Sequence, residues 1–208
     1  MFRRVSKLDK GLDAFDRGEW RRARKLLEES LAEEDRAMGR YRLGILLWRG
    51  LGCKPDKAAA VEHFARAAED GLPGAQTAYG IALRSGVGVA KDVEHAREQF
   101  RAAAGAQDGE AMVQLATLSE PEEARYWLLR GSENGYAPAM VHLSDVMIER
   151  DPVDALSWLY CAVALSGDDA ARKRGAVLAR EPTAKEISAA QKAGRIYVKE
   201  IQSRSQGR

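Results

Sequence analysis

The sequence has few residues that would cross-link the chain or anchor it in a membrane. Cysteine occurs only twice in 208 residues, at Cys53 and Cys161, which excludes a disulfide-stapled scaffold. The longest apolar run, residues 158–165, has eight residues, whereas a membrane-spanning helix needs about 18. The basic start of the chain is not followed by the apolar stretch of about 7–15 residues that an export signal requires. We therefore expect a cytoplasmic protein without a membrane span.

An excess of one charge is also lacking. The 33 basic and 31 acidic residues leave a net charge of +2, which gives a nucleic acid or a membrane surface little overall attraction. The balance shifts along the chain, with 13 basic and 17 acidic residues over 37–167 but 10 and 5 over 168–208. Arginine outnumbers lysine by 23 to 10, which is consistent with a GC-rich bacterial genome. With 45% hydrophobic residues, the chain is apolar enough to form a folded domain.

What the sequence does contain is an internal repeat of 36 residues. Residues 37–72 align with residues 73–108 without a gap, so matching residues stand 36 positions apart. The aligned pairs include Gly44 with Gly80, Gly50 with Gly86, Gly52 with Gly88, Asp56 with Asp92, Ala60 with Ala96, and Phe64 with Phe100. Two further copies, residues 109–136 and 137–167, keep the helical segments and shorten the connections. The spacing predicts one structural motif used four times.

Each copy has the features of two helices joined by a turn. Apolar residues such as Tyr41, Leu43 and Leu47 recur at helical spacing, which gives the helix one apolar stripe. Gly50 stands where the first helix is expected to end, because glycine readily adopts the left-handed conformation of a helix C-terminus. Asp56 stands where a carboxylate can cap the unpaired N–H groups of the second helix. One such pair buries too few apolar groups to be stable alone, so we expect the pairs to stack.

These residues resemble the Sel-1-like repeat, a relative of the tetratricopeptide repeat. The stretch 43–71 matches the family pattern most fully, and the resemblance covers about residues 37–167. His63 and Gln99 depart from it, because the family usually has Trp at those places. The resemblance implies an all-α fold, a right-handed superhelical solenoid of antiparallel helix pairs.

The resemblance also implies an organisation for the chain, with residues 1–208 as a single repeat domain. The four repeats are residues 37–72, 73–108, 109–136 and 137–167. Residues 1–36 are expected to form an N-terminal capping helix pair and residues 168–208 C-terminal capping helices, because terminal repeats must turn a polar face outward. Thr183 and Glu186 have the spacing of a capping box, which predicts the start of the last helix.

The residues that could support chemistry do not form a recognisable site. The three histidines are His63, His95 and His142. They occupy different repeat positions and lack further ligands at metal-site spacing. The glycine-rich loops 50–54 and 86–91 lack the Lys-Ser/Thr pair and the preceding strand of a phosphate loop. Neither Cys53 nor Cys161 has an activating base in the sequence. We therefore expect no catalytic residue, no metal, no cofactor and no small-molecule substrate.

Stacked helix pairs imply an extended groove lined by the first helix of each repeat. Carried over from the tetratricopeptide arrangement, the groove-facing positions are Tyr41, Ile45, Trp48, Arg49, Thr77, Ile81, Arg84, Val113, Val141 and Asp145. Trp and Arg dominate many interfaces, so we expect Trp48, Arg49 and Arg84 to be the anchors. The alternative for Trp48 is packing on the adjacent repeat, and the alternative for the arginines is ordinary solvated charge.

The expected function is therefore protein binding, with another protein or peptide as the partner. One hypothesis is an intracellular scaffold or adaptor that grips its partner in the groove. An alternative is an inhibitor, such as an immunity protein, that occludes a toxin or effector enzyme with the same surface. RNA binding through the basic C-terminal region is a weaker alternative, because the sequence shows no stacked aromatic series and no one-base-per-repeat signature. A toxin gene in the genomic neighbourhood would favour the inhibitor over the scaffold.

Overall fold

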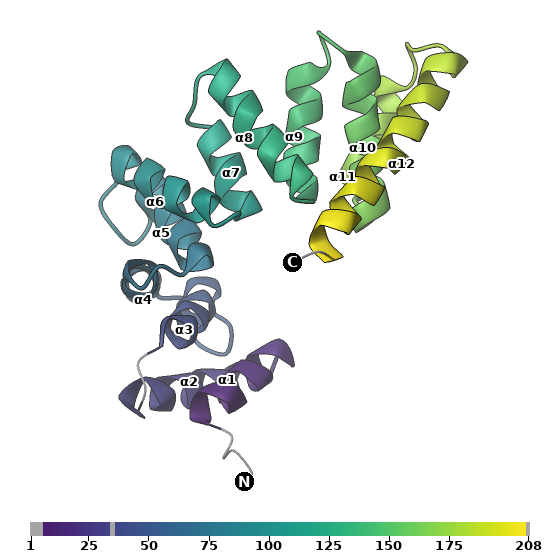
Figure 1. Cartoon of the computed structure of the whole chain (residues 1–208). Helices are drawn as coiled ribbons and strands as arrows, with labels where there is room; N and C mark the ends of the chain where they lie inside the picture. Colours follow the sequence, from purple (N-terminus) through teal and green to yellow (C-terminus); the bar gives the residue numbers. More distant parts are fainter. Residues whose placement is uncertain (1–5, 34–35, 207–208) are drawn as a thin grey trace. The chain divides into compact units, whose positions relative to one another are not determined.

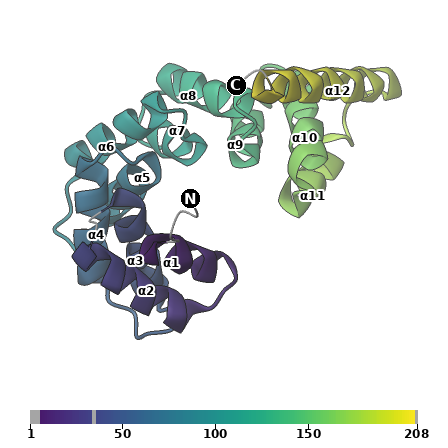
Figure 2. The ribbon, with the colours of Figure 1, turned by 60° about the horizontal axis from the view of Figure 1, so that its bottom comes forward.

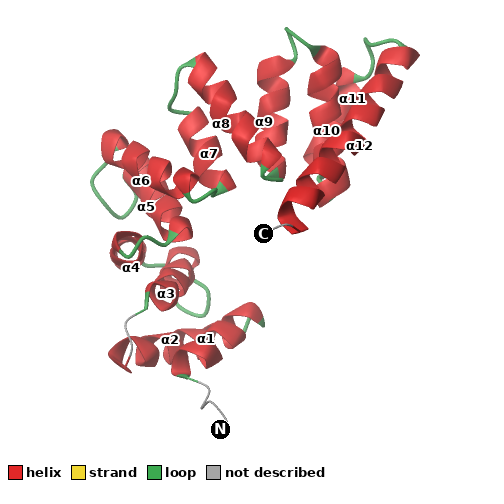
Figure 3. Cartoon of the chain, viewed as in Figure 1, coloured by secondary structure: helices red, strands yellow, loops and turns green. Residues whose placement is uncertain are grey.

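The computed structural model describes residues 6–33 and 36–206, and all regular secondary structure in these ranges is helical (Figure 3). Residues 1–5, 34–35 and 207–208, which belong to the two expected end regions, lie outside the described residues. The prediction of an all-α repeat fold is confirmed. The chain divides into two compact units, which we call the N-terminal unit (Met1–Ala106) and the C-terminal unit (Gln107–Arg208).

The N-terminal unit consists of three helix pairs. Its helices are α1 (Lys7–Asp16), α2 (Trp20–Glu33), α3 (Ala37–Arg49), α4 (Lys57–Glu69), α5 (Pro73–Ser85) and α6 (Val93–Gly105). Each odd-numbered helix packs against the helix that follows it, and successive pairs meet through α2 with α3 and α4 with α5. Within this unit α1, α3 and α5 lie along one side and α2, α4 and α6 along the other (Figure 2). The unit thus has a face made of first helices.

The C-terminal unit begins with two helix pairs and ends differently. Its helices are α7 (Gly109–Ala116), α8 (Pro121–Glu133), α9 (Ala137–Met147), α10 (Pro152–Ser166), α11 (Asp169–Leu178) and α12 (Ala184–Gln206). The pairs α7–α8 and α9–α10 pack as in the N-terminal unit, and α8 contacts α9. The last two helices, α11 and α12, both pack against α10 (Figure 1). As a result α10 has neighbours on several sides, whereas α11 packs mainly against α10.

The two full-length repeats pack through the same close contact. A β-carbon placed on Gly44 would lie 2.6 Å from Cε1 of Phe64, and one placed on Gly80 would lie 2.6 Å from Cε1 of Phe100. Both rings are buried, with 3% and 0% of their surface exposed. Only glycine lets the first helix approach the ring this closely. The equal surroundings of Gly44 and Gly80 show that the 36-residue sequence period corresponds to a structural one.

The predicted turn residues also have the expected conformations. Gly50 and Gly86 end α3 and α5 in the left-handed region, with φ of +70° and +71°. Asp56 and Asp92 precede α4 and α6, and each carboxylate accepts a hydrogen bond at 3.0 Å from the backbone N–H three residues on. These predictions of helix ends are confirmed.

The second glycine of each long loop has a separate role, because it lies against the preceding helix pair. A β-carbon on Gly52 would be 2.7 Å from the backbone N of Arg21, at the start of α2. A β-carbon on Gly88 would be 2.5 Å from the carbonyl O of Lys57, at the start of α4. The glycine loops therefore join neighbouring pairs as well as reversing the chain.

The last helix is held in place by an aromatic stack and a capping box. Tyr197 of α12 stacks on Trp158 of α10 with ring centroids 4.4 Å apart, and its hydroxyl donates to Oδ1 of Asp154 at 2.7 Å. Burial and the neighbouring carboxylate raise the pKa of Tyr197. Ahead of α12, Thr183 and Glu186 exchange hydrogen bonds as predicted, and these bonds lower the pKa of Glu186.

Replacing Gly88 by Ala should destabilise the chain more than replacing Gly71 by Ala. The two glycines have nearly equal φ, +78° and +79°, but a methyl group on Gly71 would meet nothing within 4 Å. We expect a loss of about 1–2 kcal/mol for Gly71→Ala from backbone strain, and about 2–4 kcal/mol for Gly88→Ala because of its additional clash with Lys57. Urea unfolding followed by circular dichroism measures both, and equal losses would contradict the inter-pair role of Gly88.

Candidate functional site

In the N-terminal unit, the structure gives Trp48 a packing partner within its own repeat. The half-buried Trp48 ring lies 6.0 Å from the Phe64 ring of α4, centroid to centroid. The ammonium group of Lys57 lies 4.2 Å from the centroid of the Trp48 ring and donates to the Trp48 carbonyl. Much of the ring is thus engaged inside the helix pair, and Arg49 beside it is exposed.

The other predicted positions of this unit differ in exposure. The Tyr41 ring lies 6.0 Å from Phe64, and Tyr41 Oη would be 3.0 Å from a β-carbon on Gly74 of α5, so this ring fills the space between α3 and α5. Thr77 is only 3% exposed, which leaves little of it open to a partner. The remaining positions, Ile45, Ile81 and Arg84, are half-buried.

In the C-terminal unit, the predicted positions lie on α7 and α9. Val113 is 9% exposed, and Val141 and Asp145 are half-buried. Asp145 forms an ion pair with Arg174 of α11, a helix that the sequence prediction of the groove did not include. Asp145 also lines two separate hollows, one on each side of α9. Among the predicted positions, Asp145 lines both hollows and Val113 lines one of them.

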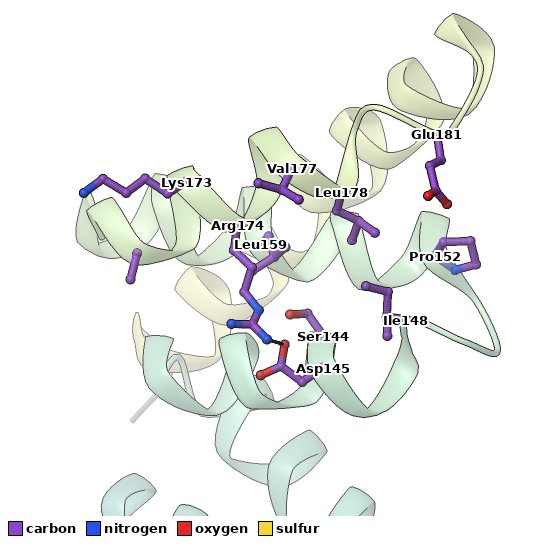
Figure 4. Close-up of a pocket in the computed structure, with 11 residues that line it drawn as sticks. Ser144, Asp145, Ile148, Pro152, Leu159, Lys173, Arg174, Val177, Leu178 and Glu181 are labelled. Atoms are coloured by element: carbon purple, nitrogen blue, oxygen red, sulfur yellow. Dashed lines mark ion pairs between the residues drawn. The ribbon is translucent and has the colours of Figure 1, made fainter.

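The larger hollow, which we call the α9–α11 hollow, has a volume of about 690 Å³ (Figure 4). Its lining residues are Ser144, Asp145, Ile148, Pro152, Leu159, Ala170, Lys173, Arg174, Val177, Leu178 and Glu181. Leu159 of α10 is 1% exposed, whereas Ile148 of α9 and Val177 of α11 are 43% and 61% exposed. An apolar floor with exposed aliphatic walls is the kind of surface that a partner side chain can cover.

Charged groups lie at defined places along the α9–α11 hollow. The Asp145–Arg174 ion pair links its two walls, and the exposed Lys173 lies toward one end (Figure 4). Glu181 lies at the other end, beyond Val177 (Figure 4). The hollow therefore combines a cation, an ion pair, an apolar section and an anion in this order.

The smaller hollow, of about 210 Å³, lies on the other side of α9. Its lining residues are Val113, Ala116, Thr117, Ala124, Leu128, His142, Asp145 and Val146. Both hollows are lined by residues of α9, one together with α7 and the other together with α11. We call the surface that contains the two hollows the first-helix face.

The groove positions predicted from the sequence do not include α11. They all lie in the four repeats, whereas residues 168–208 are expected to form capping helices. A signal was present, because Val177 is an apolar residue outside the apolar stripe formed by Ala171, Gly175 and Leu178. Ala171 and Gly175 are buried and pack on α10, whereas Val177 cannot reach α10 from the same side and is left exposed.

The two cysteines differ in their burial. Cys161 is fully buried in α10, and burial raises the pKa of its thiol to about 11. Cys53 is half-buried in the first glycine loop, where its Sγ lies 3.7 Å from the carbonyl O of Leu46. Among the residues that the structure describes, no three His, Cys, Asp or Glu side chains gather as metal ligands would. Over the same residues, no helix has the length and apolar character needed to cross a membrane.

Comparison with known proteins identifies the repeat. The Sel1 repeat family model matches residues 37–72, 73–108, 110–136 and 138–166. No curated protein matches the chain.

Several solved structures are similar to the chain in fold, including the following three. A Sel1 repeat protein from Oxalobacter formigenes matches with a TM-score of 0.74 at 21% identity, over 92% of this chain and 83% of that one. Immunity protein Pa5087 from Pseudomonas aeruginosa matches with a TM-score of 0.61 at 18% identity, over 95% and 88%. The protective antigen c5321 of uropathogenic Escherichia coli, which displays an SLR fold, matches with a TM-score of 0.56 at 21% identity, over 94% of this chain but 53% of that one. At these identities the likeness shows the fold alone.

The two thiols should differ sharply in reactivity. With Ellman's reagent at pH 8, we expect one thiol per folded chain to react, at Cys53, and both to react in denaturant, because thiolate formation at the buried Cys161 is suppressed. A Cys53→Ser variant should show no reactive thiol until it is unfolded. Rapid reaction of Cys161 in the folded variant would mean that its thiol is accessible and activated after all.

Proposed function

This chain belongs to the Sel1 repeat family, and on that premise we propose that it is a protein-binding module that holds a segment of a partner on the first-helix face of its C-terminal unit. Sel1 repeats generally mediate protein–protein interaction, which supports this class of function. The single observation that carries the proposal is the α9–α11 hollow, where Val177 and Ile148 are exposed above a buried apolar floor.

The size and lining of the hollow support an apolar side chain as the central contact. A pocket of about 690 Å³ has room for one or two large side chains of a partner. Burying one Leu or Phe side chain contributes roughly 1.5–3 kcal/mol. The partner would also cover Val177, which is exposed in the free chain. Such a contact provides a local anchor around which a larger interface can form.

The same surface offers less to RNA than to a protein. Neither hollow of the first-helix face has a Phe, Tyr or Trp among its described lining residues, and unpaired bases are usually held by stacking on such rings. The charges along the α9–α11 hollow are of both signs, so a phosphate backbone would meet repulsion as well as attraction.

Both the scaffold and the inhibitor hypotheses use this face. Immunity protein Pa5087 shares the fold over 88% of its length, which makes inhibition of a partner enzyme the second candidate. The two roles differ in what happens to the bound protein. An enzyme occluded by this chain loses activity in proportion to complex formed, whereas a scaffolded protein keeps its activity. The groove positions proposed for the N-terminal unit, led by Trp48 and Arg49, stay a prediction.

A displayed library of random dodecapeptides, selected on the immobilised full chain, tests the proposal. We expect peptides with a large apolar residue, and we expect Val177→Asp to weaken their binding about tenfold or more because it places a carboxylate in the apolar section. Ile196→Asp is the matched control, since Ile196 is a 46% exposed aliphatic residue on α12, outside the hollow.

Fluorescence anisotropy with labelled peptides measures the affinities, and circular dichroism checks that both variants fold. Peptides that bind the Val177→Asp variant as tightly as the unmodified chain would place the binding site elsewhere. Failure to enrich any peptide would count against a preformed peptide-binding face.

A further inference from the structure

The charged side chains of the α9–α11 hollow follow one another in a defined order along it. This order is a second feature of the hollow, beside its apolar lining. Arg174 is engaged by Asp145 across the hollow, so this pair is close to neutral as a unit. Lys173 and Glu181 form no ion pair in the described part of the chain, and both are exposed. One uncompensated cation and one uncompensated anion therefore lie toward opposite ends of the hollow (Figure 4).

The helix ends add to this polarity. The chain reverses direction between α9 and α10 and again between α10 and α11, so α9 and α11 run the same way (Figure 1). Both helices end next to the Glu181 end of the hollow, where Ile148 and Leu178 lie. Each helix C-terminus carries about half a negative charge on its unpaired carbonyl groups. The N-terminus of α10, at Pro152, lies at the same end with the opposite partial charge, but the Asp151 carboxylate caps it. The carbonyls therefore add to the negative charge of Glu181 and favour a cation at that end.

The positions of the two charges limit what can bridge them. Lys173 lies one helical turn before Val177 on α11, about 6 Å along the helix axis, whereas Glu181 follows the end of that helix at Leu178 by three residues. Because both residues line the same hollow, a short partner segment is sufficient to contact both. Val177 lies between the two charges, so an apolar side chain of the partner would enter between its own two charged groups.

Resting on the proposed function, we infer that the α9–α11 hollow selects a short partner segment with a carboxylate on one side of an apolar anchor and a basic group on the other. The carboxylate pairs with Lys173, the anchor covers Val177 and Ile148, and the basic group pairs with Glu181. The hollow thus fixes the orientation of the partner as well as its apolar content. A partner placed in the reverse direction would set carboxylate against Glu181 and cation against Lys173.

A charge-swapped variant tests this order directly. In the double variant Lys173→Glu, Glu181→Lys the net charge of the chain is unchanged and the apolar lining is kept. Peptides selected on the unmodified chain should bind this variant about tenfold more weakly, because two attractive contacts become repulsive. Peptides in which the acidic and basic residues are exchanged should recover the affinity. Lys192→Glu, Glu200→Lys is the matched control, because it swaps two exposed charges eight residues apart on α12 and should change affinity less than about twofold.

The outcomes separate this inference from the function on which it rests. Binding could depend on Val177 while the swap at Lys173 and Glu181 changes the affinity no more than the α12 control does. That result would contradict the proposed charge selectivity and would leave the proposed protein-binding face supported. If peptide binding does not depend on Val177, the proposed protein-binding face is itself contradicted. Self-association of the chain in sedimentation velocity, abolished by Val177→Asp, would make a second copy the occupant and would also overturn the inference.

Discussion

The fold depends on a close approach of helix backbone to aromatic ring inside each full-length repeat. Gly44 on Phe64 and Gly80 on Phe100 are two instances of one contact, with the same 2.6 Å approach at the position of a missing β-carbon. The contact excludes water from the ring and sets the separation of the two helices in the pair. A pair of 13-residue helices is nevertheless marginal by itself, because the entropy of ordering it is close to what its few buried groups contribute. Stability therefore comes from joining pairs.

The two units join their pairs in different ways. In the N-terminal unit, the glycine loops reach back to the preceding second helix, and Gly88 fits there only because it has no side chain. In the C-terminal unit the loops are short, and α8 and α10 begin directly with Pro121 and Pro152. Here the long α12 covers the surface of α10, with Tyr197 stacked on Trp158 of α10.

The α9–α11 hollow follows from this arrangement. Because α12 uses the surface of α10, it does not pair with α11 in the way that α4 pairs with α3. One side of α11 is left without cover, and Val177 on that side is 61% exposed. The Asp145–Arg174 ion pair links α11 to α9 and leaves an apolar space beside it. The candidate binding site is thus a consequence of how the array ends.

The sequence by itself determined the helix pairs, their period and the residues that end and begin each helix. Gly50, Gly86, Asp56 and Asp92 act through their own backbone conformation or through a bond three residues away, so local reasoning was sufficient for them. Only the tertiary structure decided which first-helix residues stay exposed. Thr77 was placed in the groove by analogy and is buried, whereas Val177 was assigned to a cap and is open. Exposure depends on which helix packs on which, and that is set by contacts between residues distant in sequence, such as Tyr197 with Asp154 and Trp158.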